Sequence, residues 1–187
     1  KNIGGKTEEE LYEKLGLRYI EPELREMTGE IPAAAIHSGL SLESQTKSGM
    51  GLPNLIGYGD LRGDLQVQTN WTDGENSIEE MALAAAKAGL EYIAITDHTV
   101  SLAMTGGLDE KKLAHQMEEI KRVNAGLQKK KINCSVLTGA EVNIMKDGSL
   151  DMTDAMLAKL DVVGASVHSH FRLSRKEQTA RVIRAIE

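Results

Sequence analysis

The sequence predicts an α/β fold in which parallel strands are joined by helices, and three observations support it. From residue 63 onward, short apolar segments alternate with longer amphipathic ones in the order β-α-β-α-β-α-β-α. Such alternation is typical of parallel strands with crossover helices. Residues with capping side chains stand before most of the helical segments. Polar residues of the types that bind metal ions follow the strands. The chain has 187 residues, enough for one domain and an appendage.

The amino-terminal third predicts a small appendage and a linker. Thr7 and Glu10 have the spacing of a capping box, so we expect a helix over residues 7–15 that Gly16 ends. Residues 31–60 contain Gly, Ser and Pro with few large apolar side chains, which indicates a linker with helical turns near residues 33–36. The predicted parts are therefore 1–30, 31–60 and 61–187.

The first strand opens the regular part of the chain. Leu65 and Val67 alternate with Gln66 and Gln68, the pattern of a half-buried strand. Asp73 and Gly74 follow as a turn, and we expect Gly74 to supply a positive φ angle.

Three further strand-helix units follow the same pattern. Ser77, Asp109, Thr153 and Ser174 stand where four helices would begin. The predicted helices cover 77–89, 109–130 and 153–160, with the last one starting at 174, and the predicted strands cover 91–96, 135–137 and 162–167.

Each strand leads into side chains that bind metals in proteins. In parallel strands these carboxyl ends converge on one face, so we expect one shared site. A mixed histidine and carboxylate set suits Zn, Mn or Fe, and such a site activates water against a phosphate ester. Asp97 would orient a neighbouring ligand or cap its own turn. The candidates are Gln66, Gln68, Asp73, His98, Glu141, His168 and His170.

Composition excludes several other classes of protein. The net charge of −6 argues against a chain whose whole surface binds nucleic acid. Cys134 is the only cysteine, so we expect a buried thiol, no disulfide within the chain and a cytoplasmic location. No apolar run approaches the roughly 20 residues of a membrane span. No Gly-rich nucleotide-binding fingerprint follows a strand. A Ser-His-Asp arrangement is also missing, which disfavours covalent catalysis.

Several motifs, in order, carry a family resemblance. They are Gly63–Thr69, Thr72–Gly74, Ile95–His98, Gly139–Val142, Asp147–Asp151 and Ser166–Ser169. Together they resemble the PHP domain (polymerase and histidinol phosphatase), and more narrowly the PHP module of bacterial and archaeal family X DNA polymerases. Residues 7–26 resemble the end of the polymerase thumb.

The resemblance implies a distorted seven-stranded β/α barrel that holds up to three metal ions, Mn or Zn before Mg or Fe. This chain would contain about four of the seven strand-helix units. The implied activity is that of a metal-dependent phosphoesterase, often a 3′-to-5′ exonuclease that trims DNA 3′ ends beside a repair polymerase. Asp73, His98, Glu141 and His168 match metal ligands of the family, whereas no role is carried over to His170.

Two departures from the family pattern weaken that expectation. Gln66 and Gln68 stand where the family has a His-x-His pair, and a neutral amide oxygen is a poor substitute for a nitrogen that favours Zn and Mn. The family's later ligands, and its palm carboxylates, fall outside this chain. We therefore expect low metal occupancy and weak activity. Four strands also leave an open edge, which oligomerisation, a domain swap or altered topology would cover.

Two other functions stay open at this point. The chain could be a catalytically inactive scaffold or interaction module attached to a DNA polymerase, which the two glutamines favour. It could also be a small-molecule phosphatase of the histidinol phosphatase type, which the thumb-like amino terminus disfavours. Bound metal distinguishes an enzyme from a scaffold.

Overall fold

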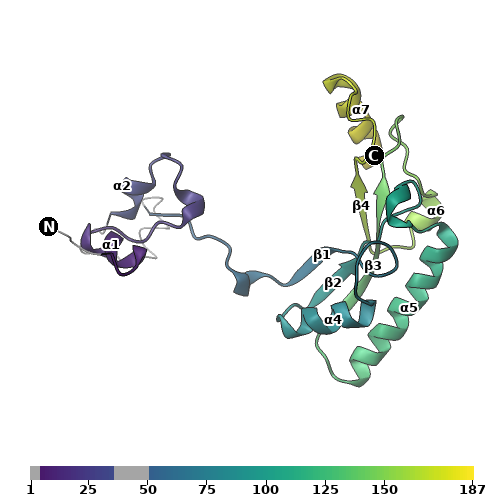
Figure 1. Cartoon of the computed structure of the whole chain (residues 1–187), viewed down its shortest axis with the longest axis horizontal. Coiled ribbons are helices and arrows are strands. Elements are labelled where there is room, and N and C mark those ends of the chain that lie inside the picture. Colours follow the sequence, from purple (N-terminus) through teal and green to yellow (C-terminus); the bar gives the residue numbers. More distant parts are fainter. Residues whose placement is uncertain (1–4, 36–50) are drawn as a thin grey trace. The chain divides into compact units, whose positions relative to one another are not determined.

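A computed structural model describes residues 5–35 and 51–187 of the chain (Figure 1). The chain divides into two compact units, Lys1–Tyr58 and Gly59–Glu187, and each is described by itself. Among the described residues, no helix is both long and apolar enough to cross a membrane.

The first unit consists of short helices. It contains α1 (Glu8–Lys14), a 3-10 turn at Pro22–Leu24 and α2 (Glu30–Ala34). Thr7 caps α1 by accepting a hydrogen bond from the Glu10 amide, as predicted. The Glu10 carboxylate accepts from the amide of Lys6 rather than from that of Thr7, so the predicted capping box forms only in its first half.

Helix α2 packs against the segment that precedes it. Leu17 forms an antiparallel bridge with Ala35, and the Arg18 amide donates to the Ala34 carbonyl at 2.8 Å. Ile20 and Ala34 are buried by this pairing. Residues 30–35 thus belong to the first unit, although we expected a linker from residue 31. Residues 36–50 of the expected linker lie outside the described residues, and they include residue 36, the last of the expected helical turns.

The second unit is a four-stranded parallel sheet in the order β1-β2-β3-β4, which confirms the predicted α/β class. Ser77 and Ser174 both form complete capping boxes, with Glu80 and Glu177. Asp109 caps the long helix. The strands are β1 (Gly63–Val67), β2 (Tyr92–Ile95), β3 (Ser135–Asn143) and β4 (Val162–Ser166), and the helices are α4 (Ile78–Lys87), α5 (Glu110–Lys129), α6 (Asp154–Leu157) and α7 (Arg175–Ile186), with a 3-10 turn at Ala103–Thr105. A further 3-10 turn at Tyr58–Asp60 spans the boundary between the two units.

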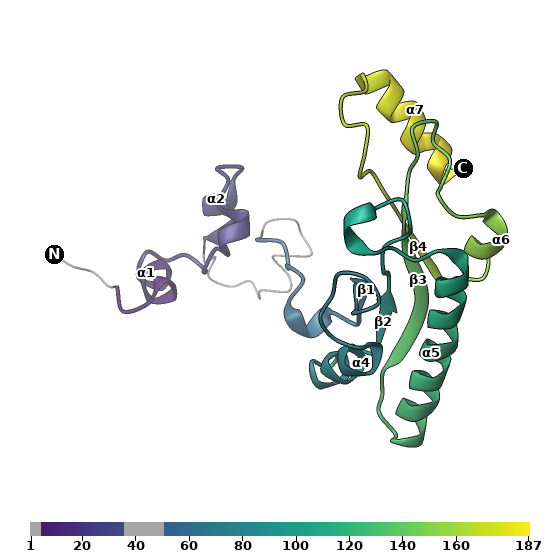
Figure 2. The same ribbon diagram turned by 45° about the vertical axis from the view of Figure 1, so that its right-hand side comes forward.

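Helices α4 and α5 cover one face of this sheet, α4 against β2 and α5 against β3 (Figure 2). The interface buries apolar side chains from both layers, such as Ile93, Ile95 and Ile120. Cys134 lies in the same cluster as a free buried thiol, as predicted, and burial raises its pKa. The face that the helices leave uncovered is available for polar side chains.

Strand β3 is three times as long as predicted and changes its neighbour halfway. Its first half, residues 135–138, pairs with β2, and residues 139–143 pair with β4. We expected the strand to end at Leu137 and to open onto Gly139. Gly139 instead continues the strand where the backbones are close, since a β-carbon there would lie 2.8 Å from the Ile95 carbonyl oxygen. The prediction failed because pairing with β4 extends the strand.

Strand β1 departs from simple alternation. Asp64 pairs with Ile93 and Val67 with Ile95, so two residues of β1 oppose one of β2 in a β-bulge. The Asp64 side chain accepts from the Gln66 amide at 2.9 Å within this bulge. Val67 is buried, but Leu65 is 50% exposed, so the prediction that both face the core was wrong for Leu65. The bulge changes which face each side chain meets.

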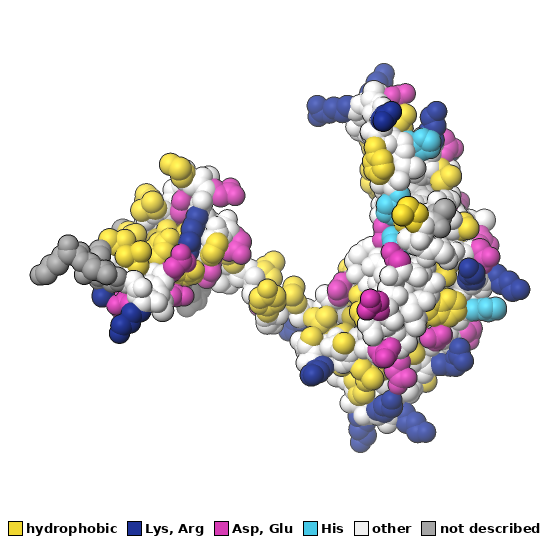
Figure 3. Space-filling view, viewed as in Figure 1, with side chains coloured by type: hydrophobic (Ala, Val, Ile, Leu, Met, Phe, Trp, Pro, Cys, Tyr) yellow, Lys and Arg dark blue, Asp and Glu magenta, His cyan; other side chains and the backbone are white. Residues whose placement is uncertain are grey.

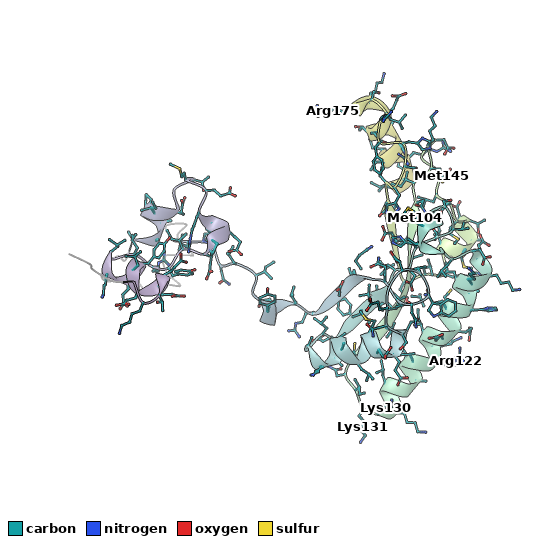
Figure 4. All side chains as sticks on the ribbon, in the orientation of Figure 1. Met104, Arg122, Lys130, Lys131, Met145 and Arg175 are labelled. Carbon is teal, nitrogen blue, oxygen red and sulfur yellow. The ribbon has the colours of Figure 1, made fainter. Side chains whose placement is uncertain are left out.

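The lysine run that ends α5 is a solvated helix terminus. Lys130 and Lys131 lie at the end of the unit remote from α7 (Figure 4). Lys130 forms an ion pair with Glu79 at 2.8 Å. Both partners are more than half exposed, so the pair contributes little to stability.

Candidate metal centre

Glu141 is the centre of the polar face of the sheet. Its neighbours Ala140 and Val142 pack beneath the helices, so the alternation of β3 turns Glu141 and Asn143 to the opposite face. Glu141 is nevertheless only 6% exposed. Its carboxylate is therefore a buried acceptor, and the groups around it determine what the site can bind.

Two histidines approach Glu141 from the neighbouring chain segments. His98 forms a parallel bridge with Glu141 just beyond β2, and its Nδ1 lies 3.8 Å from Glu141 Oε2. His168 follows β4, and its Nε2 lies 2.9 Å from Glu141 Oε1. The two rings meet edge to face with centroids 5.5 Å apart. Figure 3 shows histidine and acidic side chains next to each other where α7 meets the rest of the unit.

The two glutamines of β1 also reach Glu141. Nε2 of Gln66 and Nε2 of Gln68 both donate to Glu141 Oε2, the latter at 3.1 Å. Gly164, which opposes Glu141 on β4, leaves room for this: Gln66 Oε1 lies 3.5 Å from the place where a β-carbon of Gly164 would stand. Side chains from β1 therefore reach across the curved sheet toward β4.

Asp73 lies at the rim of the cluster, on a turn that hydrogen bonds to the buried carboxylate of Asp97 hold in place. Its Oδ2 lies 3.5 Å from His98 Nε2, and its side chain is 45% exposed. Asp97, fully buried, accepts hydrogen bonds from the Thr69 amide and hydroxyl, from Thr72 Oγ1 and from Gln116 Nε2, all at 2.6–2.7 Å. Asp97 thus fixes the turn that presents Asp73.

The prediction that Gly74 supplies a positive φ angle in this turn was wrong. Gly74 does not belong to the glycines with positive φ. A β-carbon at this position would lie 2.7 Å from the Gln68 carbonyl oxygen. Glycine is required here by close approach of the backbone rather than by a left-handed conformation.

His170, the remaining candidate, lies apart from the cluster. It is exposed with φ of 54°, and its carbonyl accepts from Gln178 Nε2. The buried Arg181 of α7 donates to the carbonyls of Ile144, Met145 and Ser169. These bonds tie together the loops that follow β3 and β4 and so hold His168 in place.

Comparison with known proteins identifies the second unit. Residues 64–185 match the PHP domain, and residues 1–26 match the thumb of DNA polymerase beta. The chain belongs to the PHP domain family. Both matches agree with the resemblance found in the motifs.

Two proteins similar to this chain differ in their names and in how much of the chain they match. The "DNA polymerase/3'-5' exonuclease PolX" of Bacillus subtilis (strain 168) is 39% identical over 88% of this chain and 26% of its own length. A "Probable phosphatase" of Thermoanaerobacter sp. (strain X514) is 34% identical over 50% of this chain and 34% of its own length. The chain spans about a quarter of the first relative and a third of the second.

The donor set of this PHP domain fits one divalent ion. Ligand atoms of His98, Glu141 and His168 all lie within 4.8 Å of one another. His98 Nδ1 is buried and has no hydrogen-bond partner among the described residues, which a bound cation would correct. Ligands at about 2.0–2.2 Å from one ion require only a small contraction of this group. Asp73 lies near the other nitrogen of the His98 ring, Nε2, and outside this group of three.

Three polar residues that sequence reasoning missed complete the surroundings. Asn143 Oδ1 lies 2.9 Å from His168 Nδ1, and Asn143 Nδ2 donates to Asp151 and to Thr99 Oγ1. Thr99 in turn donates to Asp151. Asn143 could have been found, since it shares the strand face of Glu141 two residues away. Asp151 and Thr99 had no such signal.

We expect Asp151 to make stability depend on pH. Burial raises the pKa of its carboxyl, but hydrogen bonds from Thr99, Asn143 and Ser101 together outweigh it, and the net pKa lies below the usual value of about 3.9. A depressed pKa stabilises the fold above the unfolded-state value, and this contribution is lost as pH falls through the folded-state pKa.

The measurement is thermal unfolding from pH 7 to pH 2.5 for the native chain and Asp151→Asn. The melting temperatures should differ most above about pH 5 and approach each other as the pH falls below the unfolded-state pKa of about 3.9 and through the lower folded-state pKa. A difference that stays constant over this range would contradict an ionised Asp151 in the folded state.

Proposed function

We propose that this PHP domain is a metal-dependent phosphoesterase whose substrate is the 3′ end of DNA. The observation that carries the proposal is the group of His98, Glu141 and His168 on one edge of the sheet, with His98 Nδ1 buried and unpartnered among the described residues. The exonuclease name of the Bacillus relative and the thumb match at residues 1–26 favour DNA over a small phosphate ester.

The protein's own groups would have separate tasks. Glu141, His98 and His168 would hold a divalent ion, Mn or Zn in preference to Mg or Fe. When bound, the ion supplies positive charge to phosphate oxygens and lowers the pKa of water. Asp73, half exposed at the rim, would accept a proton on the solvent side of the group. As part of this proposal, the protein acts in the cytoplasm in DNA repair.

The direct test is degradation of a single-stranded oligodeoxynucleotide that carries a label at its 5′ end. With added Mn²⁺ we expect a slowly forming ladder of products shortened one nucleotide at a time, since Gln66 and Gln68 weaken the site, and no products from His168→Ala. Products released from the interior of the strand would contradict action at the 3′ end. Release of phosphate from a simple monoester without any shortening would favour the small-molecule phosphatase.

One observation favours the alternative of an inactive scaffold. Gln66 and Gln68 satisfy Glu141 Oε2 with amide hydrogens, so one oxygen of the central carboxylate is already paired without a cation. A scaffold would contain no stoichiometric metal after purification and would keep its melting temperature in chelator. An enzyme would contain metal and lose stability in chelator.

We predict that Gln68→His raises the affinity for Mn²⁺ by about tenfold, equal to about 1.4 kcal/mol. The substitution removes the side-chain amide that donates to Glu141 Oε2, and it supplies a ring nitrogen that can bind the ion from the same position. Titration calorimetry measures the change. Gln128→His, which places a histidine on the exposed surface of α5, is the matched control. Equal affinities for Gln68→His and the native chain would mean that residue 68 does not face the ion.

A further inference from the structure

The Asn143 amide has an orientation that its neighbours dictate. Its Nδ2 lies 2.8 Å from Asp151 Oδ2 and 3.1 Å from Thr99 Oγ1. An ionised carboxylate only accepts hydrogen bonds, so the nitrogen of the amide must face Asp151 and the oxygen must face away from it. That oxygen lies 2.9 Å from His168 Nδ1.

This orientation of the Asn143 side chain determines which nitrogen of the His168 ring carries a hydrogen. An amide oxygen only accepts hydrogen bonds, so His168 Nδ1 must carry a hydrogen. The other nitrogen, Nε2, then points toward Glu141 Oε1 in the cluster. Histidines that bind metals through one nitrogen commonly donate the other N–H to a fixed acceptor, which sets the tautomer and the plane of the ring.

We propose that Asn143 and Asp151 are positioning residues, which act through one hydrogen-bond chain to hold His168 with Nε2 directed at the metal ion. Asp151 orients Asn143, and Asn143 orients His168, while Thr99 closes the chain by donating to Asp151. The proposal rests on the proposed function in so far as His168 is a ligand. It adds two residues that contact neither the ion nor the substrate.

Asp151 also has a structural role, which the experiment must separate from the positioning of His168. Asp151 also accepts a hydrogen bond from the backbone N–H of Asn143 at 2.8 Å, so it helps hold the loop after β3 in place. Asp161 provides a matched control at the other end of the sheet: it accepts from the amide and the hydroxyl of Thr138 at 2.9 and 2.8 Å, remote from the cluster in the strand pairing. Replacing Asp161 with asparagine removes a negative charge of the same kind without touching His168.

The experiment uses the 187-residue chain and two readouts. Zn²⁺ affinity is measured by competition with a chelating dye. Proton-nitrogen correlation spectra monitor the His168 Nδ1–H, which should exchange slowly with water both without metal and with Zn²⁺. We expect Asp151→Asn to weaken Zn²⁺ binding about 10- to 100-fold and to speed exchange of that proton. Asp161→Asn should change neither by more than about twofold.

Thr99→Val and Thr99→Ser keep the proposal testable if Asp151→Asn fails to fold. The serine retains the hydroxyl and should behave like the native chain, whereas the valine should show both defects. Unchanged Zn²⁺ affinity and unchanged exchange in Asp151→Asn or Thr99→Val would overturn the proposal. So would a loss of affinity with the Nδ1–H signal intact. If the native chain binds no Zn²⁺, the proposed function fails, and the exchange of the Nδ1–H alone then supports or overturns the positioning role.

Discussion

Replacing Glu141 with glutamine is expected to lower the affinity for Mn²⁺ by more than about 100-fold, beyond what loss of an outer-shell partner costs. The carboxylate contacts His168 through Oε1 and both glutamines and His98 through Oε2. An amide at this position removes the negative charge, and its NH₂ group would face either the His168 ring or the amide hydrogens of Gln66 and Gln68. With the NH₂ group toward His168, the new side chain would donate to Nε2 and occupy the lone pair that the ion needs.

Titration calorimetry with Mn²⁺ measures this loss, and Glu79→Gln is the control. Glu79 is a half-exposed carboxylate whose ion pair with Lys130 lies on the surface, so its removal should leave Mn²⁺ affinity unchanged. Native affinity in Glu141→Gln would exclude Glu141 as a ligand and would remove the centre of the proposed site.

Replacing Asp97 with alanine is expected to reduce the free energy of unfolding by about 3–5 kcal/mol. The fully buried carboxylate accepts four hydrogen bonds, and the change leaves the amide of Thr69, two hydroxyls and the side chain of Gln116 without their acceptor. Gln116 Oε1, a buried acceptor, already lacks a donor among the described residues.

Urea unfolding measures the effect, with Asp109→Ala for comparison. Asp109 caps α5 with a single bond to the Lys112 amide at 2.8 Å, and losing such a cap costs about 1 kcal/mol. If the two variants lose the same stability, Asp97 contributes no more than an ordinary cap, and the buried network is not what fixes the turn of Asp73.

The sequence was sufficient for the order of elements but not for how the strands pair. Capping residues such as Ser77, Asp109 and Ser174 act within one turn of helix, so local sequence determines them. The length of β3 depends on β4, and the exposure of Leu65 depends on a bulge against β2. Both are contacts between segments that are distant in sequence, which periodicity does not report.

The candidate site divides in the same way. His98, Glu141 and His168 were predicted because parallel strands bring their carboxyl ends together, and the structure places them in one group. The glutamines were expected to be poor ligands, yet their bonds to the carboxylate of Glu141 were not foreseen. Asn143, Asp151 and Thr99 are common polar residues, and only their mutual hydrogen bonds distinguish them. Coverage of the open sheet edge by a second copy stays a prediction.

The change of neighbour within β3 has a consequence for how ligand spacing is encoded. Strand β2 precedes His98 and pairs with the first half of β3, while β4 precedes His168 and pairs with the second half. Both neighbouring strands come close to the backbone at Gly139, where a methyl group would lie 2.8 and 3.0 Å from the Ile95 and Val162 carbonyl oxygens. Adding one carbon there would force β2 and β4 apart. The dimensions of the site thus depend on a residue that has no side chain to place in it.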